Sequence, residues 1–546
     1  MASLMTSQAV RPSRNMVTTV AIMSQLALMA CQQKTGAFSN RSLGNIHVDS
    51  NGALVRLSAD PLAVPVPPQD GKKLAPLAMS VPVRVRPEKN SDTVGLLRVG
   101  SRVARSEQAV SRRECPGGWY AIRPVGFVCS DQDTTTDLQH PIVRAMNVEP
   151  DRTKPMPYHY GFLRAIAPNY LKVPSKEEQY KYEMRLERHL RNWKKLGETW
   201  DSMEVGANDV SLNADGMAVG QPQSEKAMGA QVDRFGAVGD ERVPWWLVPQ
   251  RQIPNLSNFK APEYAVIADR VKRHAGVALI GSFVADASSQ ERRFAITTDA
   301  RLIPADKIKP NSGSPFHGQD LRDTGLPAAF VRSTHGHYWR YHDGRLEVDE
   351  AAQWRQFVPL SGTVSEIRGK RMVKTKDERW LASDDLWIVA SPSTLPAWAA
   401  KNARWIDVGI INQVLVLWEG QRPVYATLVS TGRDGLGDPQ ATHSTPTGVF
   451  RIYQKHVTST MDSNVADEEF ELRDVPWVMY FKGGYALHGA YWHDEFGRAR
   501  SHGCINLAPI DARLVFHWSS PQVPEHWHSV TSGTAFDDGT IVNVHP

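Results

Sequence analysis

Hydrophobic and polar residues alternate in short runs over much of this chain, and glycine, proline or aspartate separates the runs. A period of two is typical of strands with one buried face, and Gly, Pro and Asp are the residues that turns require. Four such runs follow one another near the C-terminus, at residues 405–408, 413–417, 424–429 and 448–452. We therefore predict a mainly β, multidomain protein in which these runs form a compact antiparallel sheet.

Two helices interrupt this pattern. The first is expected over residues 175–196, where Ser175 and Glu178 form a capping box and Gly197 supplies a stop. A shorter helix is expected over residues 509–518, because Pro and Asp stand in its first turn. The charged residues of the first helix that we expect to face solvent are Lys181, Glu183, Arg185, Glu187, Arg188 and Arg191.

Short alternating runs also occupy residues 81–129, including Val83-Arg84-Val85-Arg86 and Gly117-Gly118-Trp119-Tyr120. Their order resembles a bacterial SH3-like barrel. The resemblance implies a small barrel over residues 78–135, which either holds cell-wall peptides or serves as a spacer. Residues 31–77 before it are rich in proline and predict an extended tether.

The middle of the chain, residues 136–395, is expected to be a mixed α+β region. Residues 205–243 are rich in Gly, Ala and Asp and predict a flexible insert. Residues 297–308 match residues 375–386 at a constant offset, which predicts two related β modules. Three clustered histidines lack the cysteines or spaced carboxylates of a metal site, so we expect a surface loop at His335, His337 and His342.

Length and charge narrow the class of protein. A chain of 546 residues exceeds what one hydrophobic core usually serves, which favours three or more domains. The net charge of +5 is mild, and lysine and arginine are scattered along the chain. No nucleic-acid partner is therefore expected.

The first residues predict export. Residues 1–30 combine Arg11 and Arg14 with an apolar stretch, as signal peptides do. The sequence Leu-Met-Ala-Cys at residues 28–31 resembles a bacterial lipobox, which implies that Cys31 is lipidated and anchors a periplasmic protein to a membrane, the outer membrane in our interpretation. The alternatives are an ordinary signal peptide and an uncleaved anchor, because polar residues interrupt the apolar run.

The four cysteines fit an exported protein. If Cys31 carries lipid and Cys115 pairs with Cys129 in an oxidising compartment, Cys504 is left as a thiol. Cys115 and Cys129 flank the strand expected around Trp119, so a bond between them is geometrically plausible. A remaining thiol in an exported protein is explained by catalysis, or by simple burial.

The surroundings of Cys504 favour catalysis. The sequence runs His488-Gly489 and later Ser501-His502-Gly503-Cys504-Ile505-Asn506. A thiol attacks only as the thiolate, and imidazole is the usual side chain that takes its proton. Residues Cys504 and His488 alone therefore indicate thiol acyl transfer.

This motif resembles the L,D-transpeptidase (YkuD-type) catalytic domain, whose signature is His-Gly and then Ser/Thr-His-Gly-Cys-hydrophobic-Asn or Arg. Residues 430–432 and 444–450 look like a further block of that family. The resemblance implies a YkuD-like β-sandwich or barrel with short helices at residues 396–546. An acidic stretch, residues 456–474, resembles a mobile lid or an insertion over the site rather than part of the core.

The resemblance assigns roles. Cys504 would be the nucleophile, His488 the general acid and base, Gly489 the carbonyl that orients His488, and the N–H of Gly503 an oxyanion donor. The substrate would be a peptidoglycan stem peptide, whose acyl group passes to an amine of another stem or of a wall-attached protein. The residues expected to bind this substrate are His502, Ser501, Asn506 and Tyr491.

Three other interpretations remain. The same thiol site can hydrolyse stem peptides as a carboxypeptidase or endopeptidase, or the chain can be a non-catalytic wall-binding scaffold. A metal site is the third, since His488, His493, His502 and Cys504 are suitable ligand types. Two would-be ligands stand only two residues apart around Gly503, unlike common zinc spacings, so we expect no metal and no cofactor.

Overall fold

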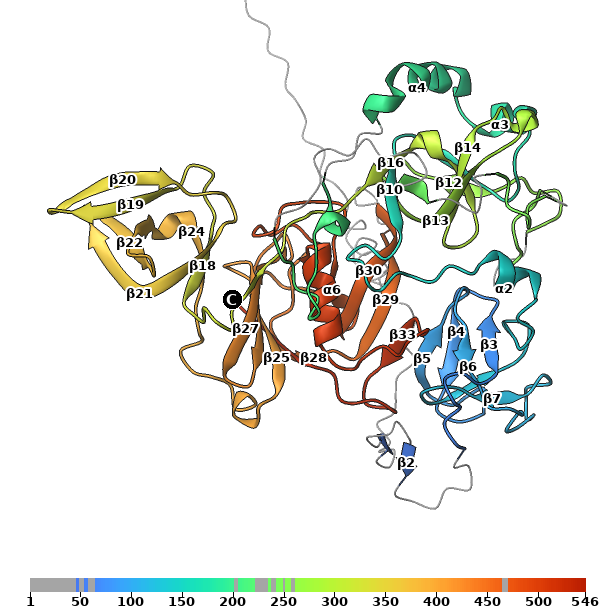
Figure 1. Ribbon diagram of the computed structural model, residues 1–546, viewed down its shortest axis with the longest axis horizontal. Helices are drawn as coiled ribbons and strands as arrows, with labels where there is room; N and C mark the ends of the chain where they lie inside the picture. Colours follow the sequence, from blue (N-terminus) through green and yellow to red (C-terminus); the bar gives the residue numbers. More distant parts are fainter. Residues whose placement is uncertain are drawn as a thin grey trace, which may run out of the picture.

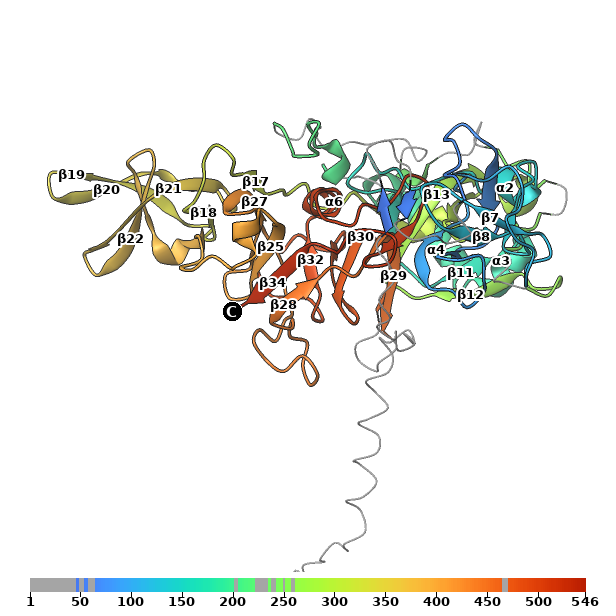
Figure 2. The same ribbon diagram turned by 90° about the horizontal axis from the view of Figure 1, so that it is seen from below.

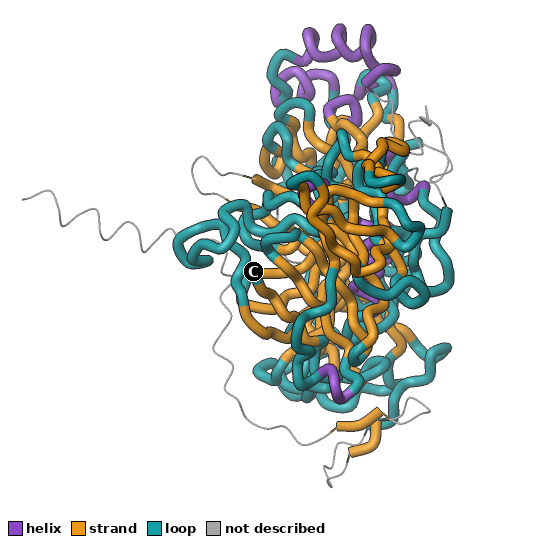
Figure 3. Tube along the Cα trace, turned by 90° about the vertical axis from the view of Figure 1, so that its left-hand side faces the viewer, coloured by secondary structure: helices purple, strands orange, loops and turns teal. Residues whose placement is uncertain are grey.

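The structure is a computed structural model that describes residues 46–48, 54–56, 64–200, 205–220, 234–236, 242–248, 251–256, 261–463 and 470–546. The predicted export signal and Cys31 lie outside these residues. Strands dominate the described part, as predicted (Figures 1 and 3). None of the helices in that part is long and apolar enough to cross a membrane.

The C-terminal part contains a sheet with the strand order β17-β27-β26-β25-β34-β28. The four runs predicted near the C-terminus lie in its strands β25, β26, β27 and β28. The prediction of a purely antiparallel sheet is wrong, because β25 pairs in parallel with the last strand, β34. The bounds are β17 Gln319–Asp320, β25 Arg404–Gly409, β26 Val414–Glu419, β27 Arg422–Leu428, β28 Gly448–Arg451 and β34 Ile541–His545.

A second layer packs against this sheet and carries the motif. It consists of β29 (Gln454–Ser463), β30 (Phe470–Lys482), β31 (Tyr485–Gly489), β32 (Ile505–Leu507) and the helix α6 (Pro509–Trp518). Helix α6 has the predicted bounds. Over its described residues, the acidic stretch at 456–474 forms most of the antiparallel pair β29 and β30. The expectation that this stretch lies outside the core is wrong at Val457, which is fully buried. Its role as a lid or insertion over the site stays a prediction.

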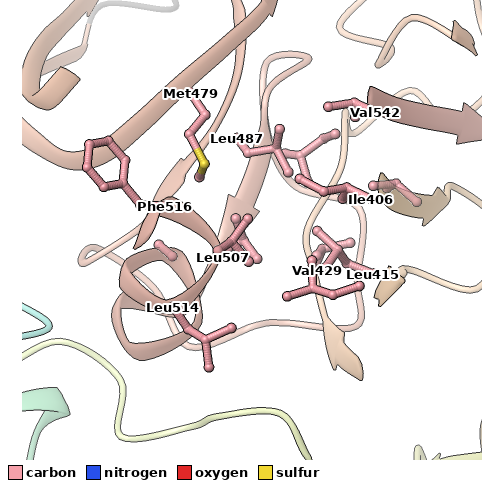
Figure 4. Packing of buried hydrophobic residues seen from close by; sticks show 14 of the residues in the cluster. Ile406, Leu415, Val429, Met479, Leu487, Leu507, Leu514, Phe516 and Val542 are labelled. Carbon is pink, nitrogen blue, oxygen red and sulfur yellow. The ribbon is translucent and has the colours of Figure 1, made fainter. Parts of the chain in front are cut away.

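The core of the C-terminal part lies between the two layers and α6 (Figure 4). Leu487 from β31 and Leu507 from β32 meet Ile406 and Leu415 from the facing sheet there. Burying each of these side chains stabilises the fold by about 1.5 to 3 kcal/mol. Both motif strands are therefore held from one side by a closely packed apolar core.

Buried polar groups fix α6 at its two ends. Near the first turn, Asp511 accepts hydrogen bonds from the Tyr425 hydroxyl at 2.7 Å and the Gly318 N–H at 2.9 Å. At the last turn, the amino group of the buried Lys455 donates to the carbonyls of Phe516 and Ser519, and burial lowers the pKa of this group well below its ordinary value. These hydrogen bonds satisfy carbonyls that have no partner within the helix.

The N-terminal region is a small β unit that is joined to the C-terminal part. Strand β33 (Ser529–Thr531) pairs with β29 on one side and with β5 on the other. Cys115 and Cys129 form the predicted disulfide. The strands of this unit are β3 Lys73–Pro76, β4 Val81–Arg84, β5 Thr93–Leu97, β6 Val103–Ala104, β7 Trp119–Ala121, β8 Phe127–Cys129 and β9 Thr134–Thr135, and the helix α2 (Pro141–Ala145) follows them. The resemblance of this unit to SH3-like barrels stays a prediction.

The C-terminal boundary of the tether predicted over residues 31–77 is wrong. Strand β3 lies inside residues 31–77, pairs with β6 and β9, and buries Leu74 and Ala75. Two further strands, β1 (Ile46–Val48) and β2 (Leu54–Arg56), pair with each other in the same stretch. The apolar residues that follow the prolines therefore belong to the folded unit.

The first half of the middle region extends the largest sheet, in which β13 lies beside β30 (Figure 1). Two helices, α3 (Lys176–Tyr182) and α4 (Leu186–Trp200), accompany it. The strands are β10 His159–Leu163, β11 Ala167–Tyr170, β12 Ile267–Val271, β13 Gly276–Val284, β14 Arg293–Thr297, β15 Leu302–Pro304 and β16 Ile308–Asn311.

The single helix predicted over residues 175–196 is wrong, although its capping box at Ser175 is present. The chain breaks between α3 and α4, and α4 runs past Gly197. Glu183 lies in the break and was expected to face solvent. It is instead buried and bound to Arg292 at 2.7 Å and to Lys307 at 2.8 Å. Arg292 and Lys307 are buried cations and require an acidic partner. A continuous helix with Glu183 on its exposed face would not supply that partner.

The flexible insert predicted over residues 205–243 is wrong for residues 205–220. Ala207 and Val210 are buried beside strands of the second layer, and Met217 enters the core of the C-terminal part. Burial of Ala207, Val210 and Met217 therefore holds residues 205–220 in a defined position.

The second half of the middle region is a separate β unit, which we call the outer module (residues 328–389). It forms the lobe at one end of the molecule in Figures 1 and 2. Its strands are β18 Ala328–Val331, β19 His337–His342, β20 Arg345–Ala351, β21 Phe357–Ile367, β22 Lys370–Thr375, β23 Trp380–Ala382 and β24 Leu386–Val389. The clustered histidines, expected in a loop, lie at and just before β19, where His337 and His342 are exposed.

The two segments of the predicted repeat contain the same turn. In the first, the Thr297 hydroxyl donates to Asp299 and accepts the N–H of Arg301. In the outer module, Thr375 makes the same two contacts with Asp377 and Arg379. A short helical turn follows the next strand in both segments.

One buried ion pair joins the N-terminal unit to the second layer. Arg98 donates to both carboxylate oxygens of Asp474, which also accepts from the hydroxyls of Thr298 and Thr458. The Arg98 guanidinium and these hydrogen bonds hold the pKa of Asp474 well below its usual range, against the effect of burial. Tyr160 donates to the backbone carbonyl of Asp474 at 2.8 Å.

Removing one partner of this pair should be costly. We expect Asp474→Ala to lower the free energy of unfolding by about 3 to 5 kcal/mol, because it leaves a buried guanidinium without its counter-ion. Denaturant unfolding followed by tryptophan fluorescence measures this change. The control is Glu107→Ala, which breaks the exposed pair with Lys72 and should stay within about 1 kcal/mol of wild type. Equal effects of the two variants would contradict the prediction.

Candidate active site

The register of β31 and β32 places the motif residues. The two strands run parallel, with Leu487 opposite Ile505 and His488 opposite Asn506. Leu487 and Ile505 are fully buried in the core between the layers. Because side chains alternate between the faces of a sheet, His488 and Asn506 lie on the opposite face.

Cys504 immediately precedes β32, so alternation from Ile505 predicts the same face as His488. Cys504 packs against the cluster that contains Ala486. Extension of the register by one residue sets Cys504 opposite Ala486, so His488 lies two residues further along the adjacent strand. The thiol is partly exposed and its Sγ lies 3.8 Å from the Gly484 carbonyl.

His488 is buried and oriented by its own chain. Its Nδ1 lies 3.4 Å from the Gly489 carbonyl, the partner predicted from the sequence, and its ring makes a tilted contact with Trp492 at 5.6 Å between centroids. A carbonyl only accepts, so Nδ1 carries the proton and Nε2 has the lone pair. Burial lowers the pKa of His488 to about 4, although the Gly489 carbonyl opposes this shift. The ring is thus a neutral base at neutral pH.

Gly503 has a conformation that favours glycine. Its φ is +116°, and a Cβ would lie 2.6 Å from Cε1 of Tyr485. The N–H of Gly503 donates to the Ser501 hydroxyl at 3.0 Å, and that hydroxyl donates to the Cys504 carbonyl at 2.5 Å. The predicted oxyanion role of the Gly503 N–H is therefore not supported, because the Ser501 hydroxyl accepts it. Ser501 is buried and holds the turn before Cys504, which corrects its predicted role in substrate binding.

Two other predicted substrate contacts are buried. Tyr491 is 1% exposed, its ring lies tilted against Tyr160 at 4.6 Å between centroids, and its hydroxyl donates to the Arg473 carbonyl at 3.3 Å. Asn506 is 3% exposed, and its side-chain amide lies 3.0 Å from Nε2 of His493. Both predictions are corrected: Tyr491 belongs to the packing between the second layer and the middle region, and Asn506 belongs to the support of β32.

His502 is the predicted substrate residue that does lie at the surface. Its ring contacts His443 at 4.8 Å and Phe470 at 5.2 Å between centroids. Asp434 holds His443 through its backbone N–H at 2.8 Å and through Nδ1 at 3.2 Å. The sequence analysis missed His443 and Phe470. His443 directly precedes the block at residues 444–450, a signal that was available, whereas nothing in the sequence singles out Phe470.

The C-terminal part matches a known protein family. Residues 403–544 match the model of the YkuD family, described as an L,D-transpeptidase catalytic domain. The C-terminal part is a YkuD-type L,D-transpeptidase catalytic domain. The match covers this domain and no other part of the chain.

Individual relatives agree with the family match. YciB of Bacillus subtilis (strain 168), named as a candidate L,D-transpeptidase, is 26% identical over 172 residues, which are 27% of this chain and 74% of YciB. A crystal structure of an L,D-transpeptidase from Stackebrandtia nassauensis is 24% identical over 27% of this chain and 57% of that one, with a TM-score of 0.19. The catalytic domain of an L,D-transpeptidase from E. faecium is 24% identical over 26% of this chain and 98% of that one, with a TM-score of 0.20. TM-scores this low do not establish a shared fold. The identity of the C-terminal domain therefore depends on the match to the family model.

The three histidines of the motif region, His488, His493 and His502, lie in two different environments. His488 and His493 are buried, and burial lowers the pKa of each to about 4, whereas His502 is exposed. Within the described residues, no group of three or more His, Cys, Asp or Glu side chains is arranged to hold a metal ion. The register of β31 and β32 thus sets Cys504 and His488 on one face, and burial disfavours the charged form of the His488 imidazole.

The pKa of His488 can be tested directly. We expect its imidazole to titrate at about pH 4, because burial disfavours the charged form. The unfolded chain takes up this proton near pH 6.5, so His488 should reduce stability as the pH falls from about 6.5 to about 4. Nuclear magnetic resonance of histidine-labelled protein, assigned with His488→Gln, measures the titration. A pKa of 6.5 or above would contradict this account.

Proposed function

We propose that this protein is a peptidoglycan L,D-transpeptidase. The observation that carries the proposal is the placement of Cys504 and His488 on one face of two paired strands, inside a YkuD domain. A partly exposed thiol beside a buried neutral imidazole is suited to nucleophilic attack on an amide carbonyl. A stem peptide of the cell wall is the substrate that the family match favours.

The first step forms a thioester. The Cys504 thiol transfers its proton to Nε2 of His488 as the sulfur attacks the carbonyl between the third residue of the stem and its terminal D-Ala. A carbon–sulfur bond forms, and the tetrahedral intermediate collapses with cleavage of the carbon–nitrogen bond. The imidazolium returns the proton to the leaving amine, which departs as D-Ala.

The second step regenerates the thiol. An amine of another stem, or of a wall-attached protein, attacks the thioester, and His488 takes its proton. The carbon–sulfur bond breaks, the new amide remains, and the proton returns to Cys504. Throughout both steps the Gly489 carbonyl keeps Nδ1 protonated, so the lone pair at Nε2 faces the reaction.

We further propose that the protein works outside the cytoplasm and is anchored by lipid at Cys31. The disulfide between Cys115 and Cys129 supports this, because such bonds persist in oxidising compartments. Stem peptides are accessible in the same compartment.

Incubation with a disaccharide tetrapeptide, followed by mass spectrometry, tests the proposal. We expect dimers joined between third residues and release of D-Ala. Cys504→Ser should abolish both products, and His488→Ala should lower kcat/KM by roughly 100-fold to 10,000-fold, because the proton acceptor is lost. The matched control is His342→Ala, since that side chain is 78% exposed in the outer module and should not affect the rate.

Other outcomes distinguish the alternatives. Release of D-Ala without dimers, or cleavage of added dimers, would indicate that the protein is a hydrolase and not a transpeptidase. Unchanged substrate with binding to cell-wall sacculi would indicate a scaffold. Full activity of Cys504→Ser would refute any role for this thiol.

A further inference from the structure

A long loop separates the two reacting groups in sequence. Strand β31 ends at Gly489 and β32 begins at Ile505, so the intervening residues determine how Cys504 is presented to His488. This stretch, residues 490–504, contains no regular strand or helix. Its position must therefore come from contacts with other parts of the chain.

One contact lies inside the molecule. Nδ1 of His493 accepts the N–H of Glu495 at 3.2 Å. On the other side of the ring, Nε2 lies 3.0 Å from Nδ2 of the Asn506 side chain. The ring therefore contacts both its own loop and strand β32. Asn506 is the residue paired with His488, so His493 connects the loop to the catalytic strands.

The next residue is held from outside by the outer module. Arg355 donates to both carboxylate oxygens of Asp494, at 2.8 and 2.7 Å. Ser314 also donates to this carboxylate. A bidentate guanidinium contact fixes direction as well as distance.

Arg355 is itself held rigidly. Its guanidinium lies 3.7 Å from the ring centroid of Trp354 and 4.6 Å from that of Phe316, and its side chain is 10% exposed. The backbone N–H of Arg355 donates to the Val331 carbonyl in β18 at 2.7 Å. An arginine ordered in this way loses little side-chain entropy on binding a carboxylate, unlike an exposed pair.

Two further contacts join the outer module and its connection to the same loop. The Phe316 ring stacks on Phe496 at 5.9 Å. Gly497 lies against Trp387 of β24, where a Cβ would come within 2.4 Å of the indole. The loop thus contacts the outer module at Asp494 and Gly497, and the segment before the module at Phe496.

We infer that the outer module positions the catalytic loop, and that Arg355 is a positioning residue for the reaction through Asp494 and His493. The effect of this positioning on catalysis rests on the proposed function. The contacts of Arg355 and Asp494 themselves do not require a substrate. The outer module is then required for the geometry of the active site. A domain that served only as a spacer would not be.

The test compares Arg355→Ala with Asp494→Asn and the double variant. We expect each single variant to lower kcat roughly tenfold with KM nearly unchanged, because a positioning contact affects the reacting geometry more than substrate binding. Each should also slow alkylation of Cys504 by iodoacetamide by a similar factor. The double variant should be no worse than either single one, since both break the same contact.

The matched control is Arg340→Ala, which removes an arginine of the same module from its exposed pair with Asp349. It should leave both rates unchanged. If Arg355→Ala fails to fold, judged by its circular dichroism and unfolding midpoint, Asp494→Asn carries the test, because that carboxylate is half exposed.

The inference is overturned if Asp494→Asn keeps wild-type turnover and alkylation, if the single effects add in the double variant, or if Arg340→Ala is equally slow. Alkylation needs no cell-wall substrate. Slow alkylation of the Arg355 and Asp494 variants in a protein that does not process tetrapeptides would therefore refute the proposed function and leave the positioning role intact.

Discussion

The parallel pairing of β31 with β32 is the constraint on which the active site depends. It sets His488 opposite Asn506 and, by alternation of the side chains, brings Cys504 to the same face. A shift of β32 by one residue would turn the thiol of Cys504 into the apolar core and Ile505 out of it. Full burial of Leu487 and Ile505 therefore fixes the register as well as stabilising the sheet.

The rest of the chain supports this pair of strands from several sides. The N-terminal unit continues the sheet through β33 and adds the buried pair of Arg98 with Asp474. The middle region packs Tyr160 against Tyr491, at the start of the catalytic loop. The outer module holds the same loop three residues further on, through Asp494. The parts that precede the catalytic domain in sequence are thus structural components of its site.

Local signals in the sequence predicted the elements that local chemistry determines. The alternating runs gave β25 to β28, Pro and Asp gave α6, and the motif identified Cys504 and His488. The errors arose where a distant residue decides the outcome. Glu183 is buried because Arg292 needs a partner, and Tyr491 is buried because Tyr160 covers it. Most of the described residues in 456–474 pair as antiparallel strands and bury Val457, Thr458 and Asp474, which the acidic composition of the stretch concealed.

Acylation of the thiol tests the central claim most directly. The protein is mixed with a carbapenem, an acyl donor that bypasses peptide recognition, and adduct formation is followed by mass spectrometry in wild type and in His488→Ala. The account predicts one adduct, on Cys504, which forms roughly 100-fold or more slowly without the imidazole. An adduct elsewhere, or equal rates in the two proteins, would show that Cys504 and His488 do not act together.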